Sequence, residues 1–193
     1  MDAKTDICND ALGRIGSDFI LNFEEESKNA KICRRFFKKN LRSILRMHHW
    51  NSATSFIELP QSTDEPFLNS RWSKIYNLPP DYVSVVQSQS VEDNFQIVGN
   101  QIYSNRDPLI VEYVREIEDF TKLDPLLRDA IEIGLAIRIA ASLRAEMSIE
   151  ALKNELLMVL ASARVEDAKQ RKFNYVRASP YMESRESYAD FYY

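Results

Sequence analysis

The apolar residues of this chain recur with helical spacing towards both ends and with strand-like spacing between residues 52 and 117. In this middle region Phe95–Val98 and Gln101–Ser104 flank Gly99-Asn100, a dipeptide that favours a two-residue hairpin turn. Further runs that favour strands cover residues 55–59, 71–76, 82–87 and 109–114. The change of spacing therefore predicts a small antiparallel sheet inserted between helices.

Four segments outside this middle region have the apolar spacing of α-helices. They cover residues 4–16, 25–49, 125–145 and 149–172. Asp124 and Ser148 are suitable N-caps for the last two helices, and either Ser27 or Asn22 can cap the second. Apolar residues surround most of helix 125–145, which predicts burial on several sides, either in a bundle or at a subunit contact.

These patterns predict an α+β fold. The expected architecture is an antiparallel-type bundle of about four helices, with a small antiparallel β-sheet inserted between helices 2 and 3 and an extended C-terminal arm. Residues 1–51 and 118–172 are expected to form the bundle, residues 52–117 the inserted β-domain and residues 173–193 the arm. A chain of 193 residues, 45% of them hydrophobic, is long enough to bury such a core without disulfides.

The residue patterns do not predict an active site, a metal site or a cofactor. The chain has 4 glycines, fewer than phosphate-binding loops usually need. His48 and His49 are adjacent, whereas two metal ligands on one helix face need a spacing of three or four residues. Glu116, Glu118 and Asp119 precede a helix, where solvated charge or capping is favoured over acid–base catalysis. We therefore expect a protein that is not an enzyme and has no cofactor.

The cysteines and the apolar runs of the sequence lead to two further expectations, free thiols and no membrane segment. Cys8 and Cys33 lie beside apolar residues in predicted helices, which favours buried free thiols, since a disulfide would need an oxidising compartment. The start of the sequence, MDAKTDICND, has no apolar signal-peptide core, and no run approaches 18 uncharged apolar residues. We therefore expect no membrane partner.

The predicted helix 25–49 carries eight positive charges, with no acidic residue between Lys28 and Arg46. The candidate basic face, opposite the apolar stripe, consists of Lys31, Arg34, Arg35, Lys38, Lys39, Arg42 and Arg46. Three interpretations remain: a face that is solvated or paired with acids of a neighbouring copy, a non-specific contact with nucleic-acid phosphates, or a membrane-surface helix. The net charge of −4 argues against a globally basic nucleic-acid binder but permits a local patch.

The segment 173–193 is unusually rich in aromatic side chains. They are Phe173, Tyr175, Tyr181, Tyr188, Phe191, Tyr192 and Tyr193. Either the segment folds back over its own domain, or it is an arm whose aromatic side chains insert into a groove of a partner. A fully extended arm of this length would reach roughly 70 Å.

Six stretches, taken in order, carry a resemblance to a known family. They are NDALGRIG (9–16), the helix from Ala30 to Trp50 with RMHHWNSA at its end, LPPDYV (78–83), QIVGNQIYS (96–104), VEYVREIEDFTKLDPLLRDAIEIGLAIRIAASLR (111–144) and ARVEDAKQR (163–171). In their order and spacing the chain resembles the tail tubular protein A family, the head-to-tail adaptors that connect portal and tail in short-tailed bacteriophages. The resemblance covers residues 4–172. Connector proteins of long-tailed phages have a similar helical architecture.

The resemblance implies a non-enzymatic structural virion protein, located in the viral tail below the portal vertex and assembled in the host cytoplasm. Such adaptors form a homo-oligomeric ring, commonly of twelve copies, between the portal protein and the tail nozzle protein. Double-stranded DNA passes non-specifically through the lumen of the ring during genome ejection.

The same resemblance assigns a role to each part of the chain. It implies that the helical bundle forms the ring and faces the portal, and that the β-domain faces the nozzle. The candidate nozzle-facing loops contain Asp64, Glu65, Phe67, Gly99 and Asn100. The aromatic arm is expected to dock into the portal.

An alternative is a non-enzymatic DNA-binding protein that uses the basic helix 28–46. This alternative predicts an affinity for duplex DNA that falls steeply with salt. An adaptor lumen, in contrast, should bind DNA weakly so that the DNA slides.

Overall fold

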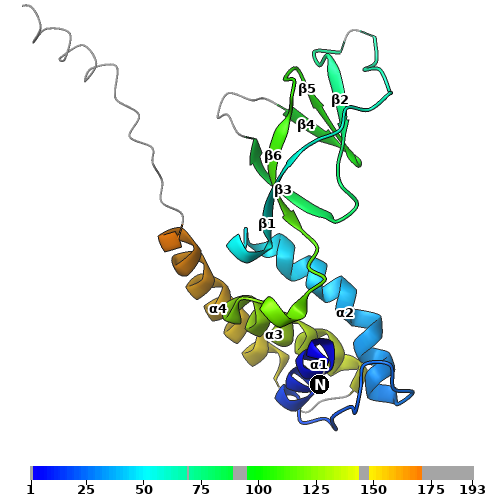
Figure 1. Cartoon of the computed structure of the whole chain (residues 1–193). Coiled ribbons are helices and arrows are strands. Elements are labelled where there is room, and N and C mark those ends of the chain that lie inside the picture. The colour runs from blue at the N-terminus through cyan, green and yellow to red at the C-terminus, as the bar shows by residue number, and fades with distance from the viewer. Residues whose placement is uncertain (1, 69, 89–94, 144–147, 171–193) are drawn as a thin grey trace, which may run out of the picture.

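The structure is a computed structural model that describes residues 2–68, 70–88, 95–143 and 148–170 (Figure 1). Its α-helices are α1 (Ala3–Arg14), α2 (Lys28–Met47), α3 (Pro125–Leu143) and α4 (Ile149–Gln170). Two short 3-10 helices, η1 (Asn51–Ala53) and η2 (Phe120–Lys122), lie where the chain passes between the helices and the strands. The α+β class and the four helices confirm the prediction from the sequence.

The β part contains two sheets where the sequence predicted one. The described strands are β1 (Thr54–Glu58), β2 (Lys74–Asn77), β3 (Tyr82–Ser88), β4 (Phe95–Val98), β5 (Gln101–Ser104) and β6 (Ile110–Arg115). They form two antiparallel sheets of three strands, in the orders β1-β6-β3 and β2-β5-β4. A small core that includes Tyr76, Ile102 and Val111 joins residues of both sheets. The prediction of a single sheet is therefore wrong, because strand spacing along a sequence does not reveal which strands pair.

The predicted hairpin forms as expected. β4 pairs with β5 so that Val98 lies opposite Gln101, with Gly99-Asn100 as the turn between them. Gly99 has a φ of 61°, a left-handed conformation that favours glycine. A second turn leads from β2 to β3, where the Tyr82 amide donates to the Pro79 carbonyl at 3.1 Å.

α3 is the central helix of the bundle and contacts α1, α2 and α4. Its buried residues come from all sides of the helix and run from Leu127 to Ala140. Of the two explanations for its all-round apolar surface, burial within a single chain is therefore the one that the structure supports. A subunit contact is not needed to cover this helix.

Local capping explains where α2, α3 and α4 begin. The Ser27 hydroxyl accepts a hydrogen bond from the Ala30 amide at 3.3 Å, so Ser27 rather than Asn22 caps α2. Asp124 accepts from the Leu126 amide at 2.9 Å and starts α3. The Ser148 hydroxyl likewise accepts from an amide in the first turn of α4. Cys8 and Cys33 are both free and buried, as predicted.

Candidate functional site

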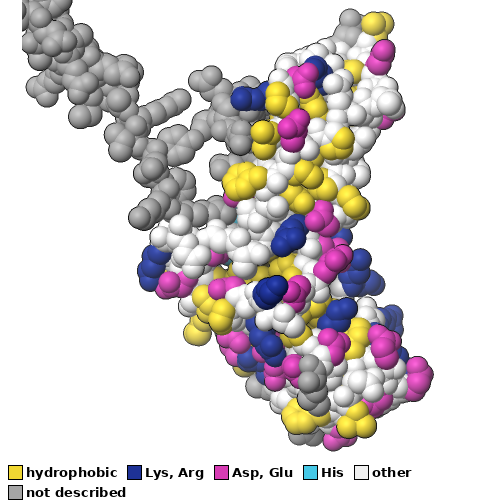
Figure 2. All heavy atoms as spheres, in the orientation of Figure 1, with side chains coloured by type: hydrophobic (Ala, Val, Ile, Leu, Met, Phe, Trp, Pro, Cys, Tyr) yellow, Lys and Arg dark blue, Asp and Glu magenta, His cyan; other side chains and the backbone are white. Residues whose placement is uncertain are grey.

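The candidate basic face of α2 divides into residues that bind their own chain and residues that point outward. Buried Cys33, Phe37, Leu41 and Ile44 form the opposite side of the helix, which lies in the main core. Charges of both signs are interspersed over the helical part of the molecule (Figure 2). The partners of each basic residue show whether its charge is paired within the chain or is available to a neighbouring copy, to nucleic acid or to a membrane surface.

The N-terminal basic residues hold the loop that precedes α2. Arg34 Nη1 donates to the carbonyl oxygens of Phe23 at 2.7 Å and of Glu25 at 2.8 Å. Lys31 Nζ lies 2.7 Å from a carboxylate oxygen of Glu26. Hydrogen bonding and attraction from Lys31 lower the pKa of Glu26 from its ordinary value. Arg34 therefore holds the loop between α1 and α2, and Lys31 adds only an exposed ion pair to it.

The C-terminal basic residues hold the β part against the bundle. Arg42 Nη1 and Lys38 Nζ lie 2.7 Å and 3.1 Å from the two carboxylate oxygens of Glu116, which follows β6. Arg42 also donates to the Tyr82 carbonyl at 3.1 Å, and Arg46 donates to the Val83 carbonyl at 3.2 Å. These basic residues thus contact both β3 and the chain that follows β6, and this contact fixes the β part on α2.

Arg35 and Lys39 remain directed to solvent. Both are exposed, and within the described part of the chain neither has an acidic partner. The Arg35 guanidinium lies 5.5 Å from the centre of the neighbouring Phe36 ring. The surface of α2 that is open to another molecule is therefore smaller than the seven residues predicted from the sequence.

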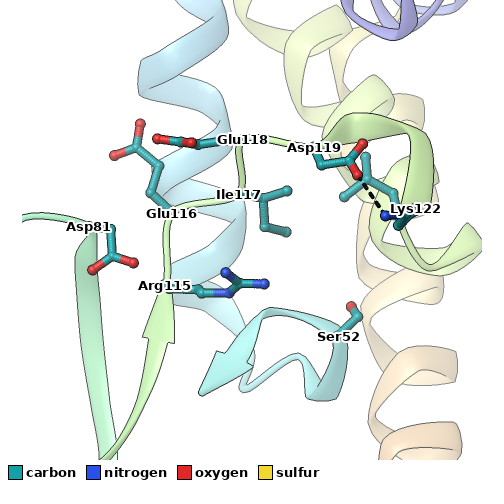
Figure 3. A pocket seen from close by; sticks show the side chains of 9 residues that line it. Ser52, Asp81, Arg115, Glu116, Ile117, Glu118, Asp119 and Lys122 are labelled. Carbon is teal, nitrogen blue, oxygen red and sulfur yellow. Dashed lines mark ion pairs between the residues drawn. The ribbon is translucent and has the colours of Figure 1, made fainter. Parts of the chain in front are cut away.

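A cavity of about 430 Å³ lies beside this contact (Figure 3). We call the surrounding region the junction, residues 48–53 and 115–123, where the chain passes between the bundle and the β part. Charged side chains line the cavity, among them Asp81, Arg115, Glu118 and Lys122. Figure 3 shows that they come from the end of β6, the connection to η2, η2 itself and the chain before β3.

Two of the carboxylates around the cavity, Asp119 and Asp81, have structural partners. Asp119 accepts from the Thr121 amide at 3.0 Å and lies 3.3 Å from Lys122 Nζ, so it caps η2. Both oxygens of Asp81 lie 3.3 Å from the Tyr113 hydroxyl. Burial and the nearby Asp81 charge raise the pKa of Tyr113. Capping and an ion pair therefore account for Asp119, and the contact with Tyr113 accounts for Asp81.

His48 binds the last turns of α4. Its Nε2 atom lies 2.5 Å from Asp167 Oδ2, and its ring packs edge-on against Trp50 with ring centres 5.0 Å apart. Asn51 Nδ2 donates to the Asp167 carbonyl at 3.1 Å. Across the described ranges, no group of three or more His, Cys, Asp or Glu residues is placed to hold a metal ion. None of the described helices is long and apolar enough to cross a membrane.

The structure brings part of the candidate nozzle-facing set together. Asp64 Oδ2 accepts a hydrogen bond of 2.8 Å from Gln101 Nε2, directly beside the Gly99-Asn100 turn. Hydrogen bonds from Ser62 and Gln101 lower the pKa of Asp64. Phe67 lies further along the same loop and is 71% exposed. The neighbouring Leu68, which the sequence analysis did not single out, is 90% exposed.

Glu65 is also exposed in this loop. The aromatic residues of the candidate arm, from Phe173 to Tyr193, lie outside the described residues.

Glu132 is a buried charge that the sequence analysis missed. It is 4% exposed on α3, with Arg128 Nε 2.8 Å and Arg14 Nη2 3.8 Å from its carboxylate oxygens. Burial raises the pKa of Glu132 to about 7, and the Arg128 hydrogen bond opposes this only in part. An acid inside an apolar helix, with an arginine four residues earlier, was the signal available in the sequence.

No protein-family model matches this chain, and a search of curated proteins finds no relative. A functional conclusion therefore has to come from the sequence and the geometry.

Proposed function

We propose that this chain is a structural virion protein, a head-to-tail adaptor that forms a ring between the portal and the tail nozzle. The observation that carries the proposal is the insertion of a two-sheet β part between α2 and α3 of a four-helix bundle. The bundle and the sheets lie at different ends of the described molecule (Figure 1). This division gives one chain two separate surfaces, as a connector between two partners requires.

The β part is the proposed nozzle-facing end. Its loop carries two large exposed apolar residues, Phe67 and Leu68, next to the exposed acids Asp64 and Glu65. Exposed aromatic and aliphatic side chains of this kind commonly anchor protein interfaces. The Asp64–Gln101 hydrogen bond connects this loop to the hairpin turn at Gly99-Asn100.

The bundle is the proposed ring-forming and portal-facing end, and the aromatic segment 173–193 is the proposed portal-docking arm. Each copy in a ring of twelve would contribute an arm, so modest single contacts would add up to a strong attachment by avidity. DNA would pass through the lumen without sequence-specific contacts. The attachment of the β part to α2 through Glu116 would keep the two ends in a fixed relation under load.

The test is a pull-down of purified portal protein with chains lacking residues 174–193. Since the described bundle ends at Gln170, the truncated chain should keep its circular dichroism spectrum while losing portal binding. Retained portal binding by the folded truncated chain contradicts the docking role. As a matched control, a full-length chain with Phe67→Ser and Leu68→Ser should bind the portal normally and lose the nozzle protein.

The second candidate function is DNA binding by α2, and the outward position of Arg35 and Lys39 is the observation that favours it. It predicts that the double variant Arg35→Ala, Lys39→Ala loses affinity for duplex DNA and that the wild-type affinity falls steeply with salt. An adaptor predicts weak binding that these substitutions barely change. Arg42 and Arg46 are unsuitable for this test because they contact the β part.

A further inference from the structure

The outward side of α4 is an exposed apolar helix face. Leu152, Leu160 and Ala163 bury the opposite side of α4 in the main core, where α4 packs on α3. On the outward side Leu157 is 64%, Met158 71% and Val165 55% exposed. These are large apolar side chains in the middle of a helix of 22 residues, where a solvated helix normally carries polar groups.

The outward residues recur with the spacing of a helix–helix seam. Ala151, Asn154, Met158, Ala161, Val165 and Ala168 are all exposed and follow one another at alternating intervals of three and four. This interval places a row of residues along one side of a helix that faces a second helix. The alanines allow close approach of the two backbones, and Met158 and Val165 provide the larger side chains that fill the space between them.

We propose that this face of α4 binds the same face of a second copy of the chain, with the two helices antiparallel about a two-fold axis. The pair would be centred between residues 159 and 160, so that Met158 of each copy lies opposite Ala161 of the other. At this central pair a large residue would face a small one, which favours interdigitated packing, and Asn154 would lie opposite Val165 on either side of it. Ala151 would lie opposite Ala168 at the ends of the seam.

The charges beside the seam select the antiparallel orientation. One flank carries Glu150 in its N-terminal half and Arg164 in its C-terminal half, and the other flank carries Glu155 and Lys169 in the same order. In an antiparallel two-fold pair each flank lies beside the same flank of the second copy, which runs in the opposite direction. The acidic N-terminal half of one copy therefore lies beside the basic C-terminal half of the other. A parallel pair would place the acids of both copies together at one end and the bases at the other.

These residues also make ion pairs within one chain, and those pairs are compatible with ion pairs between two copies. Glu150 lies 3.6 Å from Lys153 and Lys169 lies 2.6 Å from Glu166, both on the exposed surface. Glu155 lies 2.5 Å from Arg14 with its side chain 44% exposed. The first two pairs are exposed and contribute little to stability, so their rearrangement costs little. The Glu155–Arg14 pair is half-buried and need not break, because a carboxylate can accept from more than one donor.

The pair is independent of the proposed ring. A two-fold contact closes with two copies, whereas a ring of many copies needs a head-to-tail contact between different surfaces. One helix of this length gives an interface at the small end of the stable range, so we expect a dissociation constant on the order of micromolar.

The test is sedimentation equilibrium of the full-length chain over a concentration series. The apparent mass should rise from one to two chain masses, and Met158→Glu should weaken the association by at least roughly tenfold because it places a charge in the seam. Leu68→Glu, at another exposed apolar residue in a loop of the β part, is the control and should leave the association unchanged. A chain that stays monomeric at every concentration overturns the proposal. So does a larger assembly that Met158→Glu abolishes, because the face would then be a ring contact.

Charge reversal tests the orientation with variants that leave the seam intact. At low salt Glu150→Arg and Arg164→Glu should each weaken the dimer by roughly three- to fivefold, and the double variant should restore it. A parallel pair would be strengthened by each single reversal, and that result overturns the antiparallel arrangement. Circular dichroism of every variant checks that the fold is kept.

Discussion

Asn40 of α2 lies against Gly134 of α3 so closely that a Cβ atom at position 134 would be 2.6 Å from Asn40 Oδ1. The Asn40 amide cannot easily move away, because its Nδ2 group donates a 2.7 Å hydrogen bond to the Ile131 carbonyl on α3. Asn40 is also 1% exposed. The glycine therefore sets the distance between the two helices.

Gly134→Ala should accordingly destabilise the bundle. The added methyl group would also lie 2.9 Å from Ile44 Cδ1, so α2 and α3 would have to separate. Overpacking of this kind costs about 1–3 kcal/mol, whereas alanine gains at most about 1 kcal/mol in helix propensity. We expect a lower urea midpoint with an unchanged m-value.

Gly13→Ala on α1 is the matched control for this substitution. Its Cβ would meet the tip of the Phe19 ring at 3.3 Å, and that side chain is 69% exposed and free to shift. The variant should be neutral or slightly more stable. Equal losses at positions 13 and 134 would show that the contact with Asn40 is not the cause.

A double-mutant cycle on Arg42 and Glu116 should show that this pair couples the bundle to the β part. The Glu116 side chain is 17% exposed and that of Arg42 43%, so solvent screens the pair only in part. We expect a coupling free energy of about 0.5–1 kcal/mol from Arg42→Gln and Glu116→Gln, falling at high salt. Urea unfolding of the four proteins measures it.

The exposed pair Glu150–Lys153 provides the comparison for this cycle. Its side chains are 75% and 56% exposed, so its coupling should be close to zero. If both pairs gave the same coupling, the contact at Glu116 would be an ordinary surface ion pair without a role at the junction.

The features that could be predicted from the sequence are those set by neighbouring residues. Asp124 and Ser148 mark the starts of α3 and α4 in the sequence, because an N-cap side chain accepts from an amide only two or three residues further along. The hairpin at Gly99-Asn100 is equally local. Pairing of distant segments is not local, and for this reason the division into two sheets was missed.

Contacts between distant segments also limit how well exposed residues can be predicted from the sequence. The spacing of Arg42 placed it on a basic face of α2, but its partner Glu116 lies 74 positions further along the chain. A charge that looks available to DNA in the sequence is thus used inside the fold. On α4, apolar residues occur on both sides of the helix, so the pattern alone did not separate buried Leu160 from exposed Met158.

Glu132 should make the stability of the fold depend on pH. Its pKa is raised from 4.5 in the unfolded chain to about 7 by burial, so the folded state binds its proton more tightly. Its contribution is therefore complete below about pH 4.5 and is lost as the pH rises through about 7. Over this interval the free energy of unfolding should fall by up to roughly 1.4 kcal/mol per pH unit relative to Glu132→Gln.

Urea unfolding of both proteins at several pH values measures this difference. Asp129→Asn serves as the control because Asp129 is on the same helix but its side chain is 50% exposed. A wild type that becomes more stable relative to Glu132→Gln as the pH rises would show that Arg128 and Arg14 outweigh burial.

Asp167→Ala should release the last turns of α4 from the rest of the molecule. Asp167 Oδ2 lies 2.5 Å from His48 Nε2. Both side chains are largely buried, with 14% of the His48 side chain and 16% of the Asp167 side chain exposed. Hydrogen bonds to a charged group contribute about 1.5–3 kcal/mol. Because the end of a helix can fray alone, we expect faster amide hydrogen exchange after Ala163 with a smaller change in global stability.

Glu166→Ala, one position earlier, is the control for this substitution. It removes only an exposed pair with Lys169 and should leave exchange unchanged. Similar exchange in both variants would mean that the packing of α4 on α3, rather than the contact with His48, holds the end of this helix.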